Sequence, residues 1–342
     1  MNTKIRLLTL VALVGVAVGC SVEQPPATPT NAVAPAALPD GVQYSVTSAN
    51  AAADPSCVRT SSYPILPDSA SSPTLDTIRQ HRKLVVGVSQ TGFGLSYRDS
   101  VTGKMAGFEV DIVNHIATAL FGTDQNTVEW VSMEPGDWPA ALTGKQAKDH
   151  KVTEVDMALG AMTMTCSRWQ EWDFSTQYLN ARQLMLVRHS SPITSMRDIG
   201  GRRVCSSSGS TNLNELVGGH IFPKKPLVVS AGSNTDCMVL LQQNRVDAVF
   251  TADVILAELA AQDGTVDLLP ADNTLKLPDE PVGIGIRQTA DHSLTRVVNG
   301  VLARFRGDGQ ADRANTDWEK SYTQWLANLG PEQPPTPAYL SQ

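Results

Sequence analysis

The chain lacks the features that mark integral membrane proteins and nucleic-acid-binding proteins. Beyond residue 20 it has no hydrophobic run of about 18 residues, the length that a membrane-spanning helix needs. Its 27 Lys and Arg residues are outnumbered by 34 Asp and Glu. The resulting net charge of −7 argues against a nucleic-acid-binding surface.

Motifs for nucleophilic, phosphate-binding and zinc chemistry are missing as well. The sequence has no Gly-x-Ser-x-Gly, Gly-x-x-x-x-Gly-Lys or His-Glu-x-x-His, and its six histidines show no metal-ligand spacing. An enzyme whose Ser, His and Asp meet only in the fold stays an alternative. We expect a protein that is not an enzyme and that uses no metal or other cofactor.

The N-terminus predicts export. Lys4 and Arg6 precede an apolar run over residues 7–18, which is short for a membrane span. The run ends in a small residue followed by Cys20, which resembles a lipobox. This predicts removal of a signal peptide of residues 1–19 and lipidation of Cys20, with the protein anchored to the outer face of the cytoplasmic membrane. A plain secretory signal is the alternative, and it also implies an extracytoplasmic protein.

The next segment predicts a linker. Residues 21–56 contain no Lys or Arg, and Tyr44 is their single aromatic residue, whereas Pro, Ala, Thr and Ser are abundant. Such a composition buries too little apolar surface to offset the entropy of ordering. Ser72 followed by Pro73 is typical of a helix start. We therefore expect a flexible, lipid-anchored tether over residues 20–74.

After residue 74 the pattern alternates between strands and helices, which predicts parallel sheets covered by helices. Strands are expected at 84–88, 127–131, 156–161, 183–188, 203–206, 227–230, 246–250 and 282–286, and helices at 72–81, 107–120, 138–145, 168–171, 211–217, 237–243, 254–261, 293–306 and 318–329. In the second helix, Phe108, Ile112, Ile116 and Leu120 recur every four positions, as one buried helical face does.

The order of residues in that helix carries more information than its periodicity. The stretch begins with Gly107-Phe-Glu-Val-Asp-Ile-Val and continues three residues later with the apolar Ile116 and the small Ala117. This order resembles the signature of the family 3 extracellular solute-binding proteins, which capture polar amino acids for ABC importers. The resemblance runs from about residue 75 to 329. It implies a monomeric α/β protein with a two-lobed, type II periplasmic-binding-protein fold, in which mostly parallel sheets are joined by a two-strand hinge. Lobe 1 would comprise residues 75–187 and 283–342, and lobe 2 residues 188–282.

Four cysteines remain if Cys20 is lipidated. In an oxidising compartment an even number favours disulfides, and three pairings are possible. Cys205 ends a predicted strand and Cys237 opens a helix in the same lobe, so we pair these two, and Cys57 with Cys166. No Cys-x-x-Cys spacing supports a metal site, and free thiols are the other alternative.

An amino-acid ligand requires a planar cation, hydroxyl or N–H donors and an acceptor for its ammonium. Residues 160–168 supply these groups at the end of a predicted strand. They resemble the family's Thr-x-Thr-x-x-Arg motif. The resemblance implies that Arg168 holds the ligand carboxylate, that Thr163 assists, and that the Ala161 carbonyl receives the ammonium.

Further binding residues follow from the same resemblance. Trp138 matches an aromatic position that stacks on the ligand, and Phe93, between two glycines, is a second possible wall. In lobe 2 a hydroxyl-rich turn resembles the family's Ser-Gly-Thr-x-Ser turn. It implies that Ser210 and Thr211 complete the carboxylate site and that Ser207 contacts the side chain.

Two departures from the family pattern bear on the ligand. Ala252 stands where relatives usually have an Asp for the ammonium, with Asp253 one position later, so either Asp253 shifts inward to bind the ammonium or the ammonium is held elsewhere. Ser89, a further candidate binding residue, stands where many relatives have an Asp. A cleft with less negative charge favours glutamate or aspartate as the ligand and disfavours lysine, arginine and histidine. Glutamine and asparagine stay open as alternatives. The expected partner is an ABC permease, or alternatively a membrane receptor to which a sensor lipoprotein presents the amino acid.

Overall fold

The computed structural model describes residues 38–39, 41–47, 57, 59–123, 126–145, 151–310 and 315–341. The predicted signal peptide of residues 1–19 and the predicted lipidation site Cys20 lie outside these ranges. Within them, no helix is both long and apolar enough to cross a membrane.

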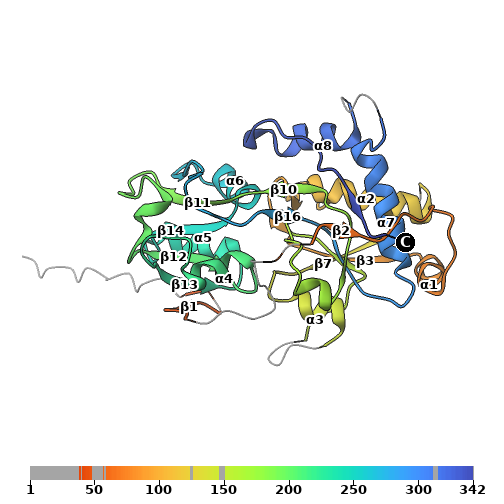
Figure 1. The fold of residues 1–342 in the computed structure, drawn as a ribbon, viewed down its shortest axis with the longest axis horizontal. Coiled ribbons are helices and arrows are strands. Elements are labelled where there is room, and N and C mark those ends of the chain that lie inside the picture. The colour runs from red at the N-terminus through yellow and green to blue at the C-terminus, as the bar shows by residue number, and fades with distance from the viewer. Residues whose placement is uncertain are drawn as a thin grey trace, which may run out of the picture. The chain divides into compact units, whose positions relative to one another are not determined.

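The two largest sheets formed by the described residues lie one at the centre of each lobe (Figure 1). The sheet of lobe 1 has the order β7-β3-β8-β17-β9, with β3 parallel to β7 and β8, and β17 antiparallel to β8 and β9. Its strands are β3 (Leu84–Val88), β7 (Val128–Ser132), β8 (Met157–Ala158), β9 (Asp173–Phe174) and β17 (Gly285–Ile286).

The sheet of lobe 2 has the order β1-β13-β12-β14-β11-β15, and only β12 with β13 and β12 with β14 are parallel pairs. Its strands are β1 (Gln43–Tyr44), β11 (Gln183–Arg188), β12 (Arg203–Ser207), β13 (Leu227–Ala231), β14 (Ala248–Ala252) and β15 (Val266–Leu268). Both sheets are thus mixed, not mostly parallel as expected. The reason is that the strands that follow the hinge strands, β11 in lobe 2 and β17 in lobe 1, run antiparallel to their neighbours, as does β1 at the edge of the lobe 2 sheet.

Two strands connect the lobes, as the resemblance implied. β10 (Leu179–Ala181) pairs antiparallel with β16 (Glu280–Val282), and Figure 1 places both between the two sheets. The predicted start of lobe 2 at residue 188 is five residues too late. Gln183 already pairs with Ala252 of β14, so β11 belongs to the sheet of lobe 2.

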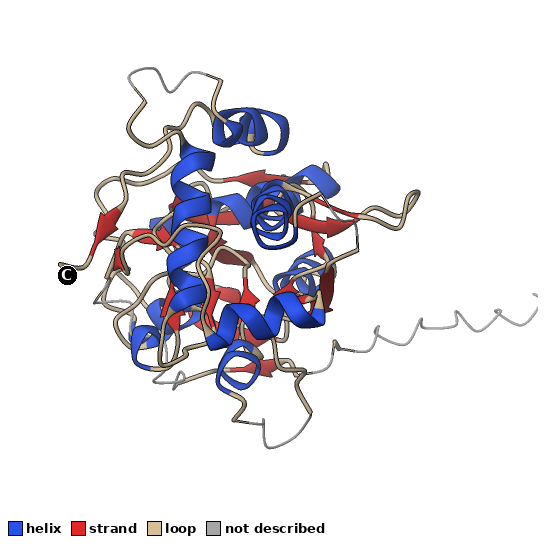
Figure 2. Ribbon diagram, turned by 90° about the vertical axis from the view of Figure 1, so that its right-hand side faces the viewer, coloured by secondary structure: helices blue, strands red, loops and turns tan. Residues whose placement is uncertain are grey.

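Helices flank both sheets (Figure 2). Lobe 1 has α1 (Pro73–His81), α2 (Phe108–Phe121), α3 (Trp138–Thr143), α7 (Ser293–Arg306), α8 (Asp317–Trp325) and the 3-10 helices η1 (Arg168–Gln170) and η3 (Ala327–Leu329); lobe 2 has α4 (Thr211–Gly218), α5 (Asn234–Gln242), α6 (Asp253–Gln262) and η2 (Met196–Ile199). Short strands complete lobe 1: β2 (Ser61–Ser62), β4 (Thr91–Gly92), β5 (Ser96–Arg98), β6 (Met105–Ala106) and β18 (Ala338–Tyr339).

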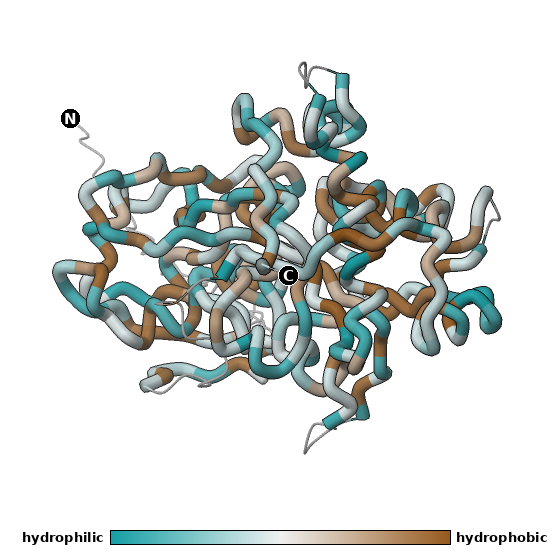
Figure 3. The backbone as a smooth tube through the Cα atoms, turned by 45° about the vertical axis from the view of Figure 1, so that its right-hand side comes forward, coloured by the Kyte–Doolittle hydropathy of each residue, from teal (hydrophilic) through white to brown (hydrophobic). Residues whose placement is uncertain are grey.

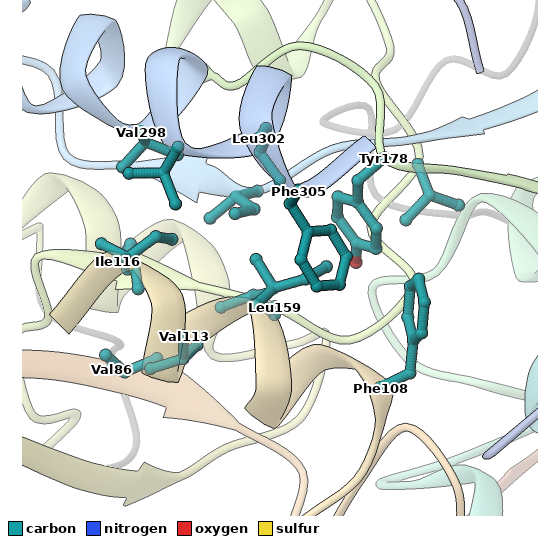
Figure 4. Packing of buried hydrophobic residues seen from close by; sticks show 14 of the residues in the cluster. Val86, Phe108, Val113, Ile116, Leu159, Tyr178, Val298, Leu302 and Phe305 are labelled. Atoms are coloured by element: carbon teal, nitrogen blue, oxygen red, sulfur yellow. The ribbon is translucent and has the colours of Figure 1, made fainter. Parts of the chain in front are cut away.

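The predicted apolar face of α2 is confirmed. Its four residues, Phe108, Ile112, Ile116 and Leu120, are buried, and they belong to one cluster with Leu302 and other α7 residues (Figure 4). Burial of one such side chain stabilises the fold by roughly 1.5–3 kcal/mol. Hydrophobic stretches of the chain occur in both lobes, in keeping with a separate core in each (Figure 3).

Part of the predicted tether is folded onto the protein. β1 pairs with the edge strand β13 of lobe 2, and β2 pairs with β18 of lobe 1. The Arg59 carbonyl accepts a hydrogen bond from the Trp169 indole at 2.8 Å, and the Arg59 guanidinium lies over that ring. Hydrogen-bonding groups at the sheet edges and in a nearby loop thus pair with the backbone of a segment whose composition predicted a linker. The prediction of a flexible tether is therefore wrong for residues 41–47 and 59–72.

Both predicted disulfides are present. Cys57 is bonded to Cys166 and Cys205 to Cys237. Cys166 lies two residues before Arg168, so the first disulfide attaches the N-terminal segment to the loop that carries the predicted carboxylate-binding arginine.

Candidate functional site

The guanidinium of Arg168 lies where the two lobes meet. Its side chain is buried, and it donates to the carbonyl oxygen of Thr163 in lobe 1 at 2.9 Å and to that of Gly209 in lobe 2 at 3.2 Å. The Arg168 N–H donates to the Thr165 hydroxyl at 3.3 Å, which fixes the start of η1. Arg168 forms no direct ion pair with a residue in the described ranges.

Trp138 lies against this guanidinium. The Arg168 Cζ is 5.1 Å from the centroid of the indole, within the range of a cation–π interaction. Trp138 opens α3, and Pro139 follows it in the first turn, where a missing N–H costs nothing. The buried ring is thereby held at the interface between the lobes.

Four side chains from three segments of the chain converge beside Arg168. The Thr163 hydroxyl is 3.2 Å from that of Thr211, the first residue of α4. Glu280 of the hinge strand β16 accepts hydrogen bonds from Thr211 and Asn212, both at 3.0 Å, and is 3.4 Å from the Thr163 hydroxyl. Thr163 reaches this position because it forms a β-bridge with Val282 of the same strand.

Burial destabilises the ionised forms of both Arg168 and Glu280. Desolvation lowers the pKa of Arg168 to about 10, although the charge of Glu280 opposes this. Desolvation raises the pKa of Glu280 to about 7, against the hydrogen bonds from Thr211 and Asn212. The site therefore holds a buried cation whose countercharge is weakened, which suits it to receive a carboxylate.

The loop before Thr163 is held by the signature helix α2. Glu109 is fully buried, and its Oε1 accepts from the N–H groups of Gly160 at 3.1 Å and Ala161 at 2.9 Å and from the Tyr178 hydroxyl at 2.5 Å. Ala161 has φ +50°, a left-handed conformation that costs a non-glycine residue of the order of 1–2 kcal/mol. The hydrogen bonds to Glu109 offset this cost and set the position of the loop.

The backbone at position 107, at the start of α2, requires a glycine. Its φ is +129°, and a Cβ at this position would overlap the Leu95 carbonyl group. Only glycine allows the backbone of α2 to approach the β4–β5 turn this closely. The N–H of Glu109 then donates to the Leu95 carbonyl at 3.0 Å.

A small cavity of about 40 Å³ lies between the lobes next to Trp138. It is lined by Ser89, Thr91, Gly92, Leu95, Ser96, Glu109, Met133, Glu134, Pro135, Trp138, Leu159 and Gly160 of lobe 1, and by Asn234, Thr235, Ile255, Glu258 and Leu259 of lobe 2. Three of these residues are glutamates, and none of the described lining residues is Lys, Arg or His.

The glutamates of this cavity favour their neutral forms. Desolvation raises the pKa of Glu134 to about 7 and the pKa of Glu109 above its usual range. The pKa of Glu258 is raised well above normal by desolvation and by the charges of Glu109 and Glu134. Ala252 and Ser89 predicted a binding cleft with fewer acidic side chains than in relatives. The prediction is wrong for this cavity, because three glutamates from other elements line it.

The structure brings together five of the predicted binding residues around Arg168. Arg168, Thr163 and Thr211 contact one another directly or through one neighbour, Trp138 lies under Arg168, and Ala161 is in the same loop. Ser89 lines the cavity, 3.4 Å from Glu134.

Four predicted residues serve other contacts. Asp253 does not move into the place left by Ala252, because it pairs with Arg182 after the hinge strand at 2.8 Å. Phe93 is 45% exposed and packs on Tyr97, away from the cavity lining. The Ser210 hydroxyl caps α4 by accepting from Leu213, and the Ser207 hydroxyl is directed to the Gly232 carbonyl.

Glu280, Asn212, Glu134 and Glu258 were missed as site residues. Asn212 lies in the hydroxyl-rich turn and could have been included. The three glutamates carry no local signal, because their neighbours in space are far away in the chain, 163 residues for Glu258 and Leu95.

Comparison with known proteins agrees with the fold. The model of the bacterial extracellular solute-binding proteins, family 3, matches residues 84–321, more than half of the chain. A glutamine-binding protein of Geobacillus stearothermophilus is 30% identical over 218 residues, which cover 64% of this chain and 77% of that protein. The ABC transporter glutamine-binding protein GlnH of Bacillus subtilis (strain 168) is 26% identical over 250 residues, which cover 72% of this chain and 85% of that protein.

Solved structures show the same architecture. An ancestral arginine-binding protein bound to glutamine is 27% identical, with a TM-score of 0.57 over 71% of this chain and 97% of that one. A mutant of ArgBP from T. maritima has a TM-score of 0.61 at 24% identity, over 74% of this chain and 99% of that one, a likeness of fold alone. The chain belongs to the bacterial extracellular solute-binding proteins, family 3.

Proposed function

We propose that this protein captures a polar amino acid between its two lobes outside the cytoplasmic membrane and delivers it to an ABC permease. The observation that carries the proposal is Arg168, a buried guanidinium that touches both lobes and has no direct ion partner among the described residues. A ligand α-carboxylate would accept two parallel hydrogen bonds from this planar group, with the Thr163 and Thr211 hydroxyls beside it.

Binding requires the lobes to separate first. A cavity of about 40 Å³ holds only a few water molecules, at roughly 10–15 Å³ each, and so is too small for an amino acid. The two-strand connection of β10 and β16 is the element about which such a motion would occur. A carboxylate would then replace the carbonyl groups of Thr163 and Gly209 around Arg168 as the lobes close.

The nature of the side chain is constrained by the cavity. Of the four amino acids that the sequence favoured or left open, glutamate and aspartate fit least, because the described cavity lining has three glutamates and no Lys, Arg or His to pair with a further carboxylate. The side chains of glutamine and asparagine need no such cationic partner. The names of two relatives describe glutamine-binding proteins and those of two others describe arginine-binding proteins, so both neutral and cationic side chains occur among the ligands named for relatives.

A thermal-shift panel of the twenty amino acids on the purified protein tests the proposal. A ligand present at 100 times its Kd should raise the free energy of unfolding by about 2.7 kcal/mol. The Arg168→Ala variant should lose this response. Stabilisation by none of the twenty would contradict the proposed function.

We further propose that the protein is a monomer anchored by lipid on Cys20. The motif around Cys20 supports the anchor. Burying one acyl chain contributes roughly 0.8 kcal/mol per methylene. A Cys20→Ser variant should move from the membrane fraction to the soluble fraction, and an unchanged distribution would contradict the anchor. Light scattering of the purified protein should give the mass of one chain, and a mass of two would contradict the monomer.

A further inference from the structure

We infer that the glutamate-lined cavity holds a cationic side chain of the ligand, so that the captured amino acid carries a guanidinium or a second ammonium group. The inference rests on the proposed function, because the carboxylate of the same ligand would meet Arg168. It reverses the preference that the sequence indicated, in which basic amino acids were disfavoured.

The first argument is a surplus of buried acceptors. Glu109 is fully buried, and its Oε2 has no hydrogen-bond partner among the described residues, although Oε1 has three. The buried Oδ1 of Asn234 is likewise without a partner there. Glu134 and Glu258 add two more carboxyl groups to the same lining. A group rich in N–H donors is the missing complement, because unpartnered buried acceptors are costly.

The second argument distinguishes an organic cation from a metal ion. No group of three or more His, Cys, Asp or Glu side chains within the described residues could hold a metal ion. The carboxyl groups come from α2, from the segment before α3 and from α6. Acceptors from three elements suit a flat guanidinium, which has five N–H donors around its edge, or an ammonium, which has three.

The third argument is the position of Trp138 between the two ends of the site. Its ring lies under Arg168 and also lines the cavity. A ligand extended along this ring would have its carboxylate at Arg168 and its side-chain end at the glutamates. Leu95, Leu159 and Ile255 also line the cavity and would pack against the aliphatic part of an arginine or lysine side chain.

The carboxyl groups make such binding dependent on pH. Glu109, Glu134 and Glu258 face one another across the cavity lining, and Asp137 and Asp236 also raise the pKa of Glu134. A cation stabilises the ionised carboxylates, so its binding releases protons. Affinity for the cation should therefore fall as the pH is lowered below about 7, where Glu134 becomes protonated in the ligand-free protein.

Calorimetric titration of the full-length protein in detergent tests the inference, with L-arginine, L-lysine, L-glutamine and L-glutamate as ligands near neutral pH. We expect arginine or lysine to bind at least about tenfold more tightly than glutamine, and its binding to release protons, seen as heats that vary with the ionisation enthalpy of the buffer. Glu134→Gln should weaken binding of the basic amino acid at least about tenfold and reduce proton release. Glu258→Gln provides a second variant in the same cavity.

A matched control is Glu129→Gln, which changes an exposed carboxylate on β7 outside the cavity lining and should leave affinity and proton release unchanged. Binding of glutamine or glutamate in preference to the basic amino acids would overturn the inference and leave the proposed function intact. So would tight arginine binding that neither glutamate variant weakens. If no amino acid binds, the proposed function fails, and the inference fails with it.

Discussion

The carboxylate of Glu258, on α6 of lobe 2, accepts a hydrogen bond from the backbone N–H of Leu95 in lobe 1 at 2.9 Å. Leu95 also accepts from the N–H of Glu109 through its carbonyl, so this contact connects α6 to the start of the signature helix. A second contact between the lobes lies close by, where the hydroxyls of Thr91 and Thr235 are 3.2 Å apart. Together with the bond from Arg168 to Gly209, these contacts hold the lobes in the closed arrangement.

Replacing Glu258 should shift the ligand-free protein toward an open form. In Glu258→Ala the N–H of Leu95 keeps only its weaker bond to the Gly92 carbonyl at 3.2 Å, and losing the partner of a buried group costs about 1–3 kcal/mol. Small-angle scattering should show a larger radius of gyration for this variant. Glu258→Gln retains an oxygen acceptor and should resemble the unmodified protein, whereas identical scattering curves for the alanine variant would argue against the role of this contact.

Removing the guanidinium of Arg168 should abolish or strongly weaken amino-acid binding. Arg168→Ala should cost about 2–5 kcal/mol of binding free energy, as for truncation of one partner of a buried charge pair. Arg168→Lys should recover little, because an ammonium cannot donate two parallel hydrogen bonds to a carboxylate. Arg197→Ala removes a partly exposed arginine paired with Asp272 in lobe 2 and serves as the control. Calorimetry that gives one affinity for all four proteins would exclude Arg168 from the site.

The ligand-free protein should lose stability as the pH rises from about 5 to about 7. Burial raises the pKa of Glu134 and of Glu280 to about 7 in the folded state, whereas an unfolded glutamate ionises near 4.3. Over this interval the unfolded chain releases protons that the folded chain keeps, so each increase in pH favours unfolding. The pKa of Asp291 is lowered by hydrogen bonds from the N–H and hydroxyl of Ser293 and from Thr289, so this residue affects the free energy of unfolding only at more acidic pH.

Denaturant unfolding at several pH values measures this slope. Glu134→Gln and Glu280→Gln should each flatten it, by about 1–3 kcal/mol over the interval. Glu129→Gln should leave the slope as it is, because that carboxylate is exposed. A slope that is unaffected by either buried substitution would show that these carboxyls ionise normally.

The two disulfides should differ in what their removal does. The Cys57–Cys166 bond closes a loop of 109 residues and the Cys205–Cys237 bond a loop of 32, so chain entropy predicts losses of about 5 and about 4 kcal/mol. Replacing the first pair by alanine should also weaken ligand binding, because Cys166 lies in the loop that ends at Arg168. Replacing the second pair should affect stability alone. Equal ligand affinities for the two double variants would show that the first disulfide does not position the site.

Local patterns were sufficient for much of the scaffold. The four-residue spacing of Phe108, Ile112, Ile116 and Leu120 predicted a buried face, because the period of a helix is a property of consecutive residues. The motif ending at Arg168 likewise predicted a residue that the structure places between the lobes. Composition misled where sheet edges were involved. Residues 41–47 lie in a segment rich in Pro, Ala, Thr and Ser, but Val42, Tyr44 and Val46 alternate as in a strand, and this segment pairs with β13.

The sequence by itself determined the family, the order of most strands and helices, and the arginine at the interface, since each follows from a short motif or from local periodicity. It left three cysteine pairings possible, and the structure contains Cys57–Cys166 and Cys205–Cys237. Only the tertiary structure decided the character of the cavity. Glu109, Glu134 and Glu258 lie far apart in the chain, and their charge state depends on how deeply they are buried and how close they are to one another. Desolvation and Coulomb interactions act through space, so three glutamates that no local sequence pattern connects form an acceptor-rich pocket in the fold.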